Sequence, residues 1–458
     1  MRSIVIHGHF YQPPRDDPWL GTIPREASAA PYHDWNERIE RESYAPVAAS
    51  LPFLSFDFGP TLLAWMERYA AETYAAVRAA DRTGNAVAMP YHRSILPLSP
   101  RRDKETEVRW GIADFRRRFG REPVGMWLPE TAVDDETLDV LAAEGIRFTI
   151  LAPHQVERVP AGGRPGWHRT SSGRRIALFL YNGALAHDVA FGPLVRDPAA
   201  WIARLTAPEA PDLLSLATDG ETFGHHHREG AATLARVLEA LSRRSDVRVE
   251  TFAAFLARHP PQEDVKLVAP SAWSCPHGVE RWRSDCGCRV HGDRATHQRW
   301  RAPLRNALDW LAGGLHQVFE REGGTIFAGD PWTVRDVYGA VLGAADDAVT
   351  NFIGERLRHP DDRSALARAR ELLELERHAL RMFTSCGWFF DDIAGLESLI
   401  VLRSAARAIQ LAGPGAAHLE AGLLERLALA PSNDAAIGTG RELYLTGVKA
   451  APARGVPT

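Results

Sequence analysis

The sequence predicts an α/β protein in which a barrel of alternating strands and helices is followed by a helical domain. Short apolar runs recur along residues 1–265, and most are followed by a stretch with apolar residues three and four positions apart. This alternation is typical of a parallel sheet, and seven or eight strands in about 260 residues favour a closed or nearly closed barrel. The chain has 458 residues, more than one core usually organises, so a second and smaller unit is expected.

The expected strands are the apolar runs, and the helices between them carry recognisable stop signals. The periodicity is clearest after residue 60 and after residue 136, and a glycine follows it. We therefore expect residues 1–265 to form the barrel. The runs are residues 3–7, 53–57, 86–89, 124–128, 147–151, 176–181, 213–217 and 248–252.

The pattern becomes helical after a loop, residues 270–299, that is rich in Trp, Cys, Gly and Arg. Gly323-Gly324 and residues 359–362 are predicted to connect helices, the second with acidic residues near a helix start. We expect residues 266–445 to form the helical domain and residues 446–458 a frayed tail. The expected apolar helix faces are Leu304, Leu308, Leu311, Leu315 and Phe319, and Leu366, Ala369, Leu373, Leu380 and Phe383.

Composition and charge exclude several classes of partner. The net charge of −4 is spread without long blocks of one sign, which gives no footprint for nucleic acid or an anionic membrane. The chain starts in a strand-like run instead of a secretory signal, and it has no 18-residue apolar run. Four cysteines are no disulfide framework. These features favour a cytoplasmic protein.

Two of the apolar runs stop at carboxylates. Residues 124–130 (VGMWLPE) end at Glu130, and residues 214–221 (LSLATDGE) end at Asp219 and Glu221. Strand ends at the mouth of a barrel are where chemistry is normally done, and glycoside hydrolysis needs two carboxylates delivered from different strands. Each stop has an ordinary interpretation, a Glu at a helix start or an acidic turn. Two such stops in one predicted barrel favour a catalytic pair.

Histidines and a tryptophan accompany these carboxylates. His7 and His9 lie two residues apart in a predicted strand, so both can point into the barrel mouth, and Gln12 follows them. Neutral imidazole and amide groups suit sugar hydroxyls, and the Trp127 indole suits the apolar face of a pyranose. The alternative is that each histidine satisfies a buried backbone group and that Trp127 belongs to the core.

These motifs resemble glycoside hydrolase family 57. Residues 7–13 (HGHFYQP), 127–130 (WLPE) and 219–224 (DGETFG) are similar to the family's first, third and fourth signature regions. The likeness is to the subgroup with an additional helical domain of unknown function, and it is supported by residues 56–62 (FDFGPTL), 91–98 (YHRSILPL), 273–282 (WSCPHGVERW) and 385–392 (SCGWFFDD). The resemblance implies a distorted (β/α)7 barrel followed by helices, and retaining action on α-glucans as an amylase, glucanotransferase, pullulanase-like or branching enzyme.

Carried over to this chain, the resemblance makes Glu130 the nucleophile and Asp219 the general acid/base, with Glu221 a neighbouring negative charge. The sequence departs from the family in two places: Phe10-Tyr11 stands before Gln12, and the family's second signature region is recognisable only as Pro90-Tyr91-His92. Substrate identity therefore stays open. The candidates for binding sugar hydroxyls are His7, His9, Gln12, His92, Glu221 and His225, and those for stacking are Trp127, Trp273, Trp282 and Trp388.

The cysteine-rich loop contains enough ligand types for zinc, namely Cys275, His277, Cys286 and Cys288 with His291 nearby. Their spacings are not the usual two to four intervening residues. We therefore expect a packed loop, with no metal and no cofactor, in which Trp273 and Trp282 close over the barrel mouth. The run His225-His226-His227 is a weak metal signal, because adjacent side chains cannot all face one ion.

Two alternatives of different class remain open. A metal-dependent carbohydrate deacetylase also uses an irregular barrel, and it would need an Asp/His/His set converging on one ion. A non-catalytic glucan-binding protein could retain the fold, although both acids are present. The expected partner is an α-glucan or oligosaccharide; the linkage, hydrolysis versus transfer, and the oligomeric state are not predicted.

Overall fold

The computed structural model describes residues 1–292 and 295–449 and divides the chain into two compact units. The barrel unit comprises residues 1–12, 25–91 and 115–274. The helical unit comprises residues 13–24, 92–114 and the chain from Cys275 on. The units thus interleave in sequence, and two early segments that the periodicity had assigned to the barrel belong to the helical unit.

The barrel unit is built around β1 (Arg2–Phe10), which pairs in parallel with β2 (Ser55–Phe58) and β6 (Leu213–Asp219). Isolated parallel bridges at residues 86–88 and 125–126 carry the pairing from β2 to β3 (Phe148–Leu151), which pairs with β5 (Arg175–Leu180). After β5, the Asn182 N–H donates to the Ser215 carbonyl in β6 at 2.8 Å. Seven segments therefore follow one another around a distorted (β/α)7 barrel, and the expected fold class is confirmed.

Three of the expected strands differ from the structure. Residues 86–89 and 124–128 contribute only isolated bridges. At the second, an added Cβ on Gly125 would lie 2.2 Å from the Phe148 ring, so the missing side chain lets the aromatic ring fill the space beside the strand. The last run is only β7 (Val247–Val249), which pairs with the start of β1. An unexpected strand, β4 (Gly166–Arg169), runs antiparallel to β5.

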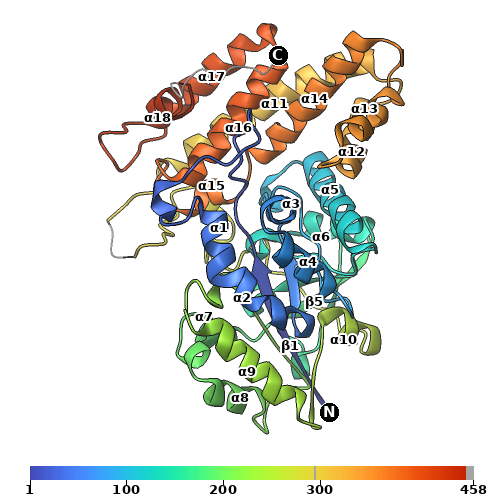
Figure 1. The fold of residues 1–458 in the computed structure, drawn as a ribbon, viewed down its shortest axis with the longest axis vertical. Coiled ribbons are helices and arrows are strands. Elements are labelled where there is room, and N and C mark those ends of the chain that lie inside the picture. Colours follow the sequence, from blue (N-terminus) through green and yellow to red (C-terminus); the bar gives the residue numbers. More distant parts are fainter. Residues whose placement is uncertain (293–294, 450–458) are drawn as a thin grey trace. The chain divides into compact units, whose positions relative to one another are not determined.

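Helices connect the strands of the barrel unit and cover its sheet, which the buried side chains of Ile4, Val5 and Ile6 anchor in the core. Figure 1 shows α7, α8 and α9 together on one side of β1. These helices are α1 (Trp35–Ile39), α2 (Ala45–Val47), α3 (Pro60–Tyr69), α4 (Ala71–Ala79), α6 (Asp135–Ala143), α7 (Gly183–Ala190), α8 (Pro198–Leu205), α9 (Gly230–Ser242) and α10 (Phe252–Arg258); α5 (Arg101–Phe119) begins in the helical unit and ends in this one.

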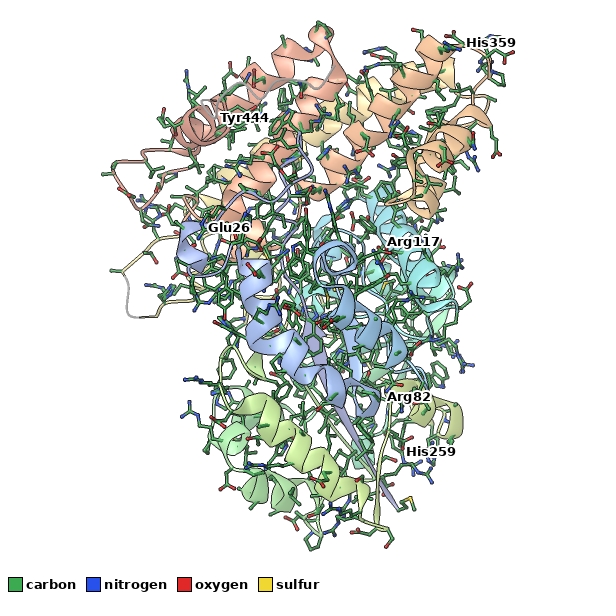
Figure 2. The ribbon with its side chains drawn as sticks, in the orientation of Figure 1. Glu26, Arg82, Arg117, His259, His359 and Tyr444 are labelled. Carbon is green, nitrogen blue, oxygen red and sulfur yellow. The ribbon has the colours of Figure 1, made fainter. Side chains whose placement is uncertain are left out.

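The helical unit packs α11, α14, α16 and α17 side by side (Figure 1), while Figure 2 places Tyr444 at α18 and His359 before α14. The five α11 side chains predicted to share an apolar face are fully buried. Asp362 caps α14 by accepting from the Ala365 N–H at 3.0 Å. The helices are α11 (Arg301–Ile326), α12 (Pro331–Tyr338), α13 (Asp346–Gly354), α14 (Arg363–Arg381), α15 (Cys386–Phe389), α16 (Leu396–Ala412), α17 (Ala417–Leu427) and α18 (Gly440–Tyr444).

Two predictions for this unit need correction. Gly323-Gly324 does not connect helices, because α11 continues to Ile326. An added Cβ on Gly323 would lie 2.8 Å from Pro331, so this glycine permits a close approach instead of ending the helix. The predicted tail begins in a short π-helix, Leu445–Lys449, and residues 450–458 lie outside the described residues. Within the described ranges, no helix has the length and apolarity that crossing a membrane requires.

Candidate active site

Glu130 lies in a strained turn at the end of its strand-like run. Its φ is 57° and that of Thr131 is 48°, and the left-handed region is unfavourable for any residue with a Cβ and most of all for a β-branched one. The buried Glu130 carboxylate accepts, at Oε2, the Ser274 hydroxyl at 2.7 Å and the Trp273 indole N–H at 3.1 Å. Two donors from one distant segment therefore fix the orientation of this carboxylate.

The neighbouring backbone is held in the same way. The Trp273 N–H donates to the Glu130 carbonyl at 3.0 Å, and Ser271 pairs with Val133 in an antiparallel bridge. The fully buried Gln155 accepts the Thr131 hydroxyl and donates to the Thr131 carbonyl, both at 2.8 Å. Strained backbone persists only where the surroundings over-determine it, and here a strand bridge and a buried amide do so.

Asp219 is the last residue of β6 and lies directly beside His9 of β1. His9 is paired with Asp57 of β2 on its other side, so the three side chains share one face of the sheet. Asp219 is half-buried. Burial and the nearby Asp219 carboxylate raise the pKa of the Tyr181 phenol, which places Tyr181 in the electrostatic surroundings of Asp219.

Glu221 is buried two residues beyond Asp219, in the turn Gly220–Thr222. Its Oε1 accepts the Tyr44 hydroxyl and the Tyr11 backbone N–H, the latter at 3.3 Å. The Ser43 hydroxyl donates to the Gly220 carbonyl at 3.0 Å. The segment before α2 thus fixes the turn that follows Asp219 and places a second carboxylate close to it in sequence.

Asp57 joins the two histidines of β1. Its two carboxylate oxygens lie 3.0 Å from His7 Nε2 and 2.7 Å from His9 Nδ1. A carboxylate accepts, so these two ring nitrogens carry the protons. Burial lowers the pKa of His7 to about 3, so its ring is neutral and its Nδ1 accepts the Ser55 hydroxyl at 3.1 Å. Both nitrogens of the fully buried His7 are therefore used within the protein.

The Trp127 ring lies against both histidines, with centroid distances of 4.8 Å to His7 and 5.0 Å to His9. It has no exposed surface, whereas Trp273, which meets it edge-on at 5.1 Å, is half-buried. The structure therefore does not support direct sugar contacts for His7 or Trp127. Both lie beneath the site and position His9 and Trp273.

Trp273 bonds to Glu130 and packs against two neighbours of Asp219. Its indole donates to Glu130, while its ring centroid lies 6.3 Å from His9, the neighbour of Asp219, and 6.5 Å from Tyr181. Glu130 and Asp219 are thus delivered to one aromatic cluster from different strand ends. Such an arrangement supplies two acids beside a ring on which a sugar could stack.

The remaining predicted residues divide between the units. Gln12 is half-buried, and His225 pairs with Glu42, both in the barrel unit. In the helical unit, His92 is buried and bonds to Glu107 through Nδ1 at 2.7 Å. Trp282 and Trp388 are at most 1 % exposed. A stacking platform needs an exposed ring face, which neither has, so we leave these two rings out of the proposed site.

The residues that could hold a metal lie in the helical unit. Ligand atoms of Cys275, His277, Cys286 and Cys288 all lie within 4.8 Å of one another. We expected a packed loop without a metal site, and the spacing of these residues had not suggested that their ligand atoms converge. His291 is elsewhere, bonded to Asp391 at 3.0 Å. The histidine run does not converge, because His225 and His227 have separate partners.

Comparison with protein families agrees with this geometry. The model of glycosyl hydrolase family 57 matches residues 25–267, more than half of the chain. The chain belongs to glycosyl hydrolase family 57. A domain of unknown function matches residues 296–454, so this family 57 member also carries the additional helical domain that the sequence suggested.

Characterised relatives are distant. The chain is 20 % identical over 234 residues to a 4-alpha-glucanotransferase of Thermococcus litoralis, covering 48 % of this chain and 35 % of that protein. It is 21 % identical over 289 residues to an alpha-amylase of Pyrococcus horikoshii, covering 60 % and 44 %. The matches thus span less than half the length of either relative.

Solved structures share the fold of this family 57 chain. An exo-type maltose-forming amylase from Pyrococcus sp. ST04 has a TM-score of 0.76 at 15 % identity, covering 93 % of this chain and 83 % of that one. A family 57 branching enzyme from Pyrococcus horikoshii has a TM-score of 0.57 at 16 % identity, covering 93 % and 88 %. At these identities the likeness concerns the fold alone.

Sequence reasoning missed several residues that build the site of this family 57 chain. Asp57 and Ser274 each lie inside a recognised motif, at residues 56–62 and 273–282, but neither motif had been given a chemical role. Tyr181 follows β5 directly, as a strand-end rule could have indicated. Tyr44 and Gln155 carry no such signal, because their partners are distant in sequence.

Proposed function

We propose that the protein is a retaining glycoside hydrolase or transglycosylase that acts on α-glucans, with Glu130 as nucleophile and Asp219 as general acid/base. One observation carries the proposal. Glu130 is held in a strained turn by Trp273 and Ser274, and the same Trp273 ring packs beside His9, the strand partner of Asp219. Strain of this kind clusters at active sites.

In the proposed first step, Glu130 attacks the anomeric carbon and the bond to the leaving oxygen breaks, while Asp219 gives that oxygen its proton. A glycosyl ester of Glu130 and an ionised Asp219 result. In the second step, Asp219 takes a proton from water or from an acceptor hydroxyl, whose oxygen displaces Glu130. Glu221 is a second buried carboxylate two residues from Asp219, held by the Tyr44 hydroxyl.

Binding in this proposal uses the groups on the accessible side of the cluster. The half-buried Trp273 provides the stacking ring. His9 is fixed by Asp57 through Nδ1 and is only 1 % exposed, so its role in this proposal is to support the Trp273 ring, which it meets edge-on at 6.3 Å. Gln12 and His225 remain candidates for hydroxyl contacts. The relatives named as glucanotransferase and alpha-amylase support an α-glucan as the substrate. A product profile on maltooligosaccharides would test whether water or a sugar accepts the glycosyl group.

The deacetylase alternative has no observation in its favour. Asp57, His7 and His9 form an Asp/His/His set, yet all three are at most 1 % exposed and Asp57 bonds both rings. A catalytic metal site keeps an open position for water and substrate, which such a sealed set does not offer. Acetate release from an acetylated oligosaccharide would favour the alternative.

Azide rescue of two truncated variants tests the assignment with an activated aryl α-maltooligoside. In Asp219→Ala the first step needs no proton donor, so aryl alcohol should appear in a burst, and azide should restore turnover with an α-glycosyl azide as product. In Glu130→Ala, azide entering from the opposite face should give the β-glycosyl azide. Reversed products would exchange the two roles.

The matched control is Asp246→Ala, which removes an exposed carboxylate of the same unit and should behave as wild type. A retaining pair also predicts that a structure with bound maltooligosaccharide places the Glu130 and Asp219 carboxyl groups about 5–5.5 Å apart. Unchanged turnover in both alanine variants would exclude the proposal.

A further inference from the structure

Four potential metal ligands converge in the loop that begins the helical unit. The Cys288 sulfur lies 3.8 Å from the Cys275 sulfur and 3.6 Å from His277 Nδ1, and no two ligand atoms of the four residues are more than 4.8 Å apart. Zinc bound to Cys at about 2.3 Å and His at about 2.05 Å has tetrahedral edges of about 3.8 Å between sulfurs and about 3.6 Å between sulfur and nitrogen. The Cys288–Cys275 and Cys288–His277 separations agree with these edges.

The backbone of the loop is shaped to bring the four side chains together. Gly278 follows His277 with a φ of 83°, and Gly287 separates Cys286 from Cys288 with a φ of 79°. Both values are in the left-handed region that glycine adopts without strain. The Gly278 N–H donates to the Cys275 carbonyl at 3.2 Å and closes the first turn. The single intervening residue in each half is therefore compatible with ligands that face one point.

A buried guanidinium lies beside the cysteine ligands. The fully buried Arg301 donates to the Cys288 carbonyl at 2.9 Å and lies 3.9 Å from the Cys286 sulfur. Arg281, which is also buried, follows the first ligand turn and donates to the Phe389 carbonyl. Three thiolates, one neutral imidazole and Zn²⁺ carry a net charge of −1, which a neighbouring guanidinium offsets.

We propose that Cys275, His277, Cys286 and Cys288 bind one Zn²⁺ in a four-coordinate structural site. Thiolate and imidazole ligands select zinc among the abundant divalent ions, because hard cations such as Mg²⁺ and Ca²⁺ take oxygen ligands. Four protein ligands leave no position for a reacting water, so the ion holds the loop together and takes no part in catalysis. Cys275 directly follows Ser274, and the ion would thus anchor one end of the segment that holds Glu130.

A disulfide is the competing use of these cysteines. The 3.8 Å between the Cys275 and Cys288 sulfurs is far longer than an S–S bond of about 2.05 Å. A disulfide would also leave His277, whose Nδ1 faces the Cys288 sulfur, without a role. The convergence of the histidine with three sulfurs is what distinguishes a metal site from a cystine.

Metal content of the full-length chain tests the proposal. The protein should be purified without a histidine tag, under reducing conditions, from cells grown with added zinc. Elemental analysis should find about one zinc per chain, and X-ray absorption should find three sulfurs at about 2.3 Å and one nitrogen at about 2.0–2.1 Å. A folded chain that takes up no zinc, or zinc surrounded only by nitrogen and oxygen, would overturn the proposal.

Matched variants locate the ion. Cys286→Ser and Cys288→Ser should each lose the zinc, as should His277→Ala. The His277 side chain is exposed, so its removal leaves no cavity in the core. Cys386→Ser changes the one remaining cysteine, which is outside the cluster, and should keep it. Circular dichroism confirms that each variant is folded. Zinc retained by Cys286→Ser and Cys288→Ser would overturn the assignment.

Thiol counting separates zinc from a disulfide. The denatured, metal-depleted chain should show four free thiols without reduction, whereas two would indicate a cystine and overturn the proposal. Removing zinc should also lower the thermal midpoint of wild type and of Cys386→Ser but not that of His277→Ala. These readouts are independent of the proposed function: azide rescue can fail while zinc is bound, and zinc can be absent while azide rescue succeeds.

Discussion

Replacing Asp57 by Asn tests the hydrogen-bond network beneath the proposed site. One side-chain amide oxygen can accept from His9 Nδ1, which leaves the amide NH2 facing His7 Nε2. His7 can respond by moving its proton to Nδ1 and donating to the Ser55 hydroxyl, which lies 3.1 Å away and can accept as well as donate. The variant thus keeps two hydrogen bonds but loses their charge assistance.

The expected cost follows from those contacts. Hydrogen bonds to a charged group are worth about 1.5–3 kcal/mol against about 1 kcal/mol for neutral pairs, so two weakened bonds lower the free energy of unfolding by about 1–4 kcal/mol. Ser55→Ala alone, which leaves one buried acceptor unpaired, should cost about 1 kcal/mol. The double variant also removes the Ser55 hydroxyl to which His7 would donate. Its loss in free energy of unfolding should therefore exceed the sum of the two single losses by at least about 1 kcal/mol.

Urea denaturation of the four proteins at pH 7.5 measures these differences, with the slope of the transition checked for constancy. Nitrogen NMR of labelled imidazole should show the proton on Nε2 of His7 in wild type and on Nδ1 in Asp57→Asn. Additive losses, together with an unchanged His7 tautomer, would refute the reasoning that Ser55 and Asp57 share this ring.

Three further outcomes are expected. The pKa of His7 is about 3 in the folded protein and 6.5 in the unfolded chain, so protons bind the unfolded chain first as the pH falls. The stability advantage of wild type over His7→Gln should therefore shrink by about 1.4 kcal/mol per pH unit below pH 6.5. An advantage that grows as the pH falls would contradict this. Gly220→Ala, whose Cβ would lie 2.1 Å from the Phe10 ring, should cost about 1–3 kcal/mol in denaturation, whereas Gly313→Ala, with nothing within 4 Å, should be neutral or stabilising. Ser274→Ala removes the 2.7 Å bond to Glu130 and should lower kcat about 10–100-fold on a maltooligosaccharide; unchanged kcat would mean that Trp273 alone positions the carboxylate.

The elements that sequence predicted well are those whose signal is local. The short apolar runs that become the buried strands β1 and β6 and the 3.6-residue face of α11 depend on residues within one segment, and the structure has them where they were expected. The failures are non-local. Gly323 marks a close approach of Pro331 instead of a helix end, and only the folded chain shows which neighbour a glycine accommodates.

The candidate site shows the same division. Strand ends and motif likeness identified Glu130 and Asp219, but the groups that hold Glu130 come from Trp273 and Ser274, more than 140 residues later. The tryptophans show the limit most clearly. Nothing in composition separates the half-buried Trp273 from the sealed Trp282, because exposure depends on packing that the local sequence does not encode.

The cysteine loop shows why the spacing of potential ligands in the sequence is a poor guide to whether their side chains converge. Structural zinc sites usually have two to four residues between paired ligands, the length of an ordinary turn that brings both side chains to one ion. Glycine in the left-handed region shortens that path, and Gly287 with a φ of 79° allows Cys286 and Cys288 to converge across a single residue.

The strain at Glu130 and the proposed zinc loop meet in one short segment. Two successive residues in the left-handed region cost about 1–3 kcal/mol each. The turn persists because residues 271–274 pair with its backbone and its carboxylate, and because Gln155 holds Thr131. That segment lies outside the regular strands and continues directly into Cys275. A tetrahedral ion at Cys275 would restrain the residue that directly follows Ser274, in addition to the strand bridge of Ser271 and the bonds of Trp273 and Ser274 to Glu130.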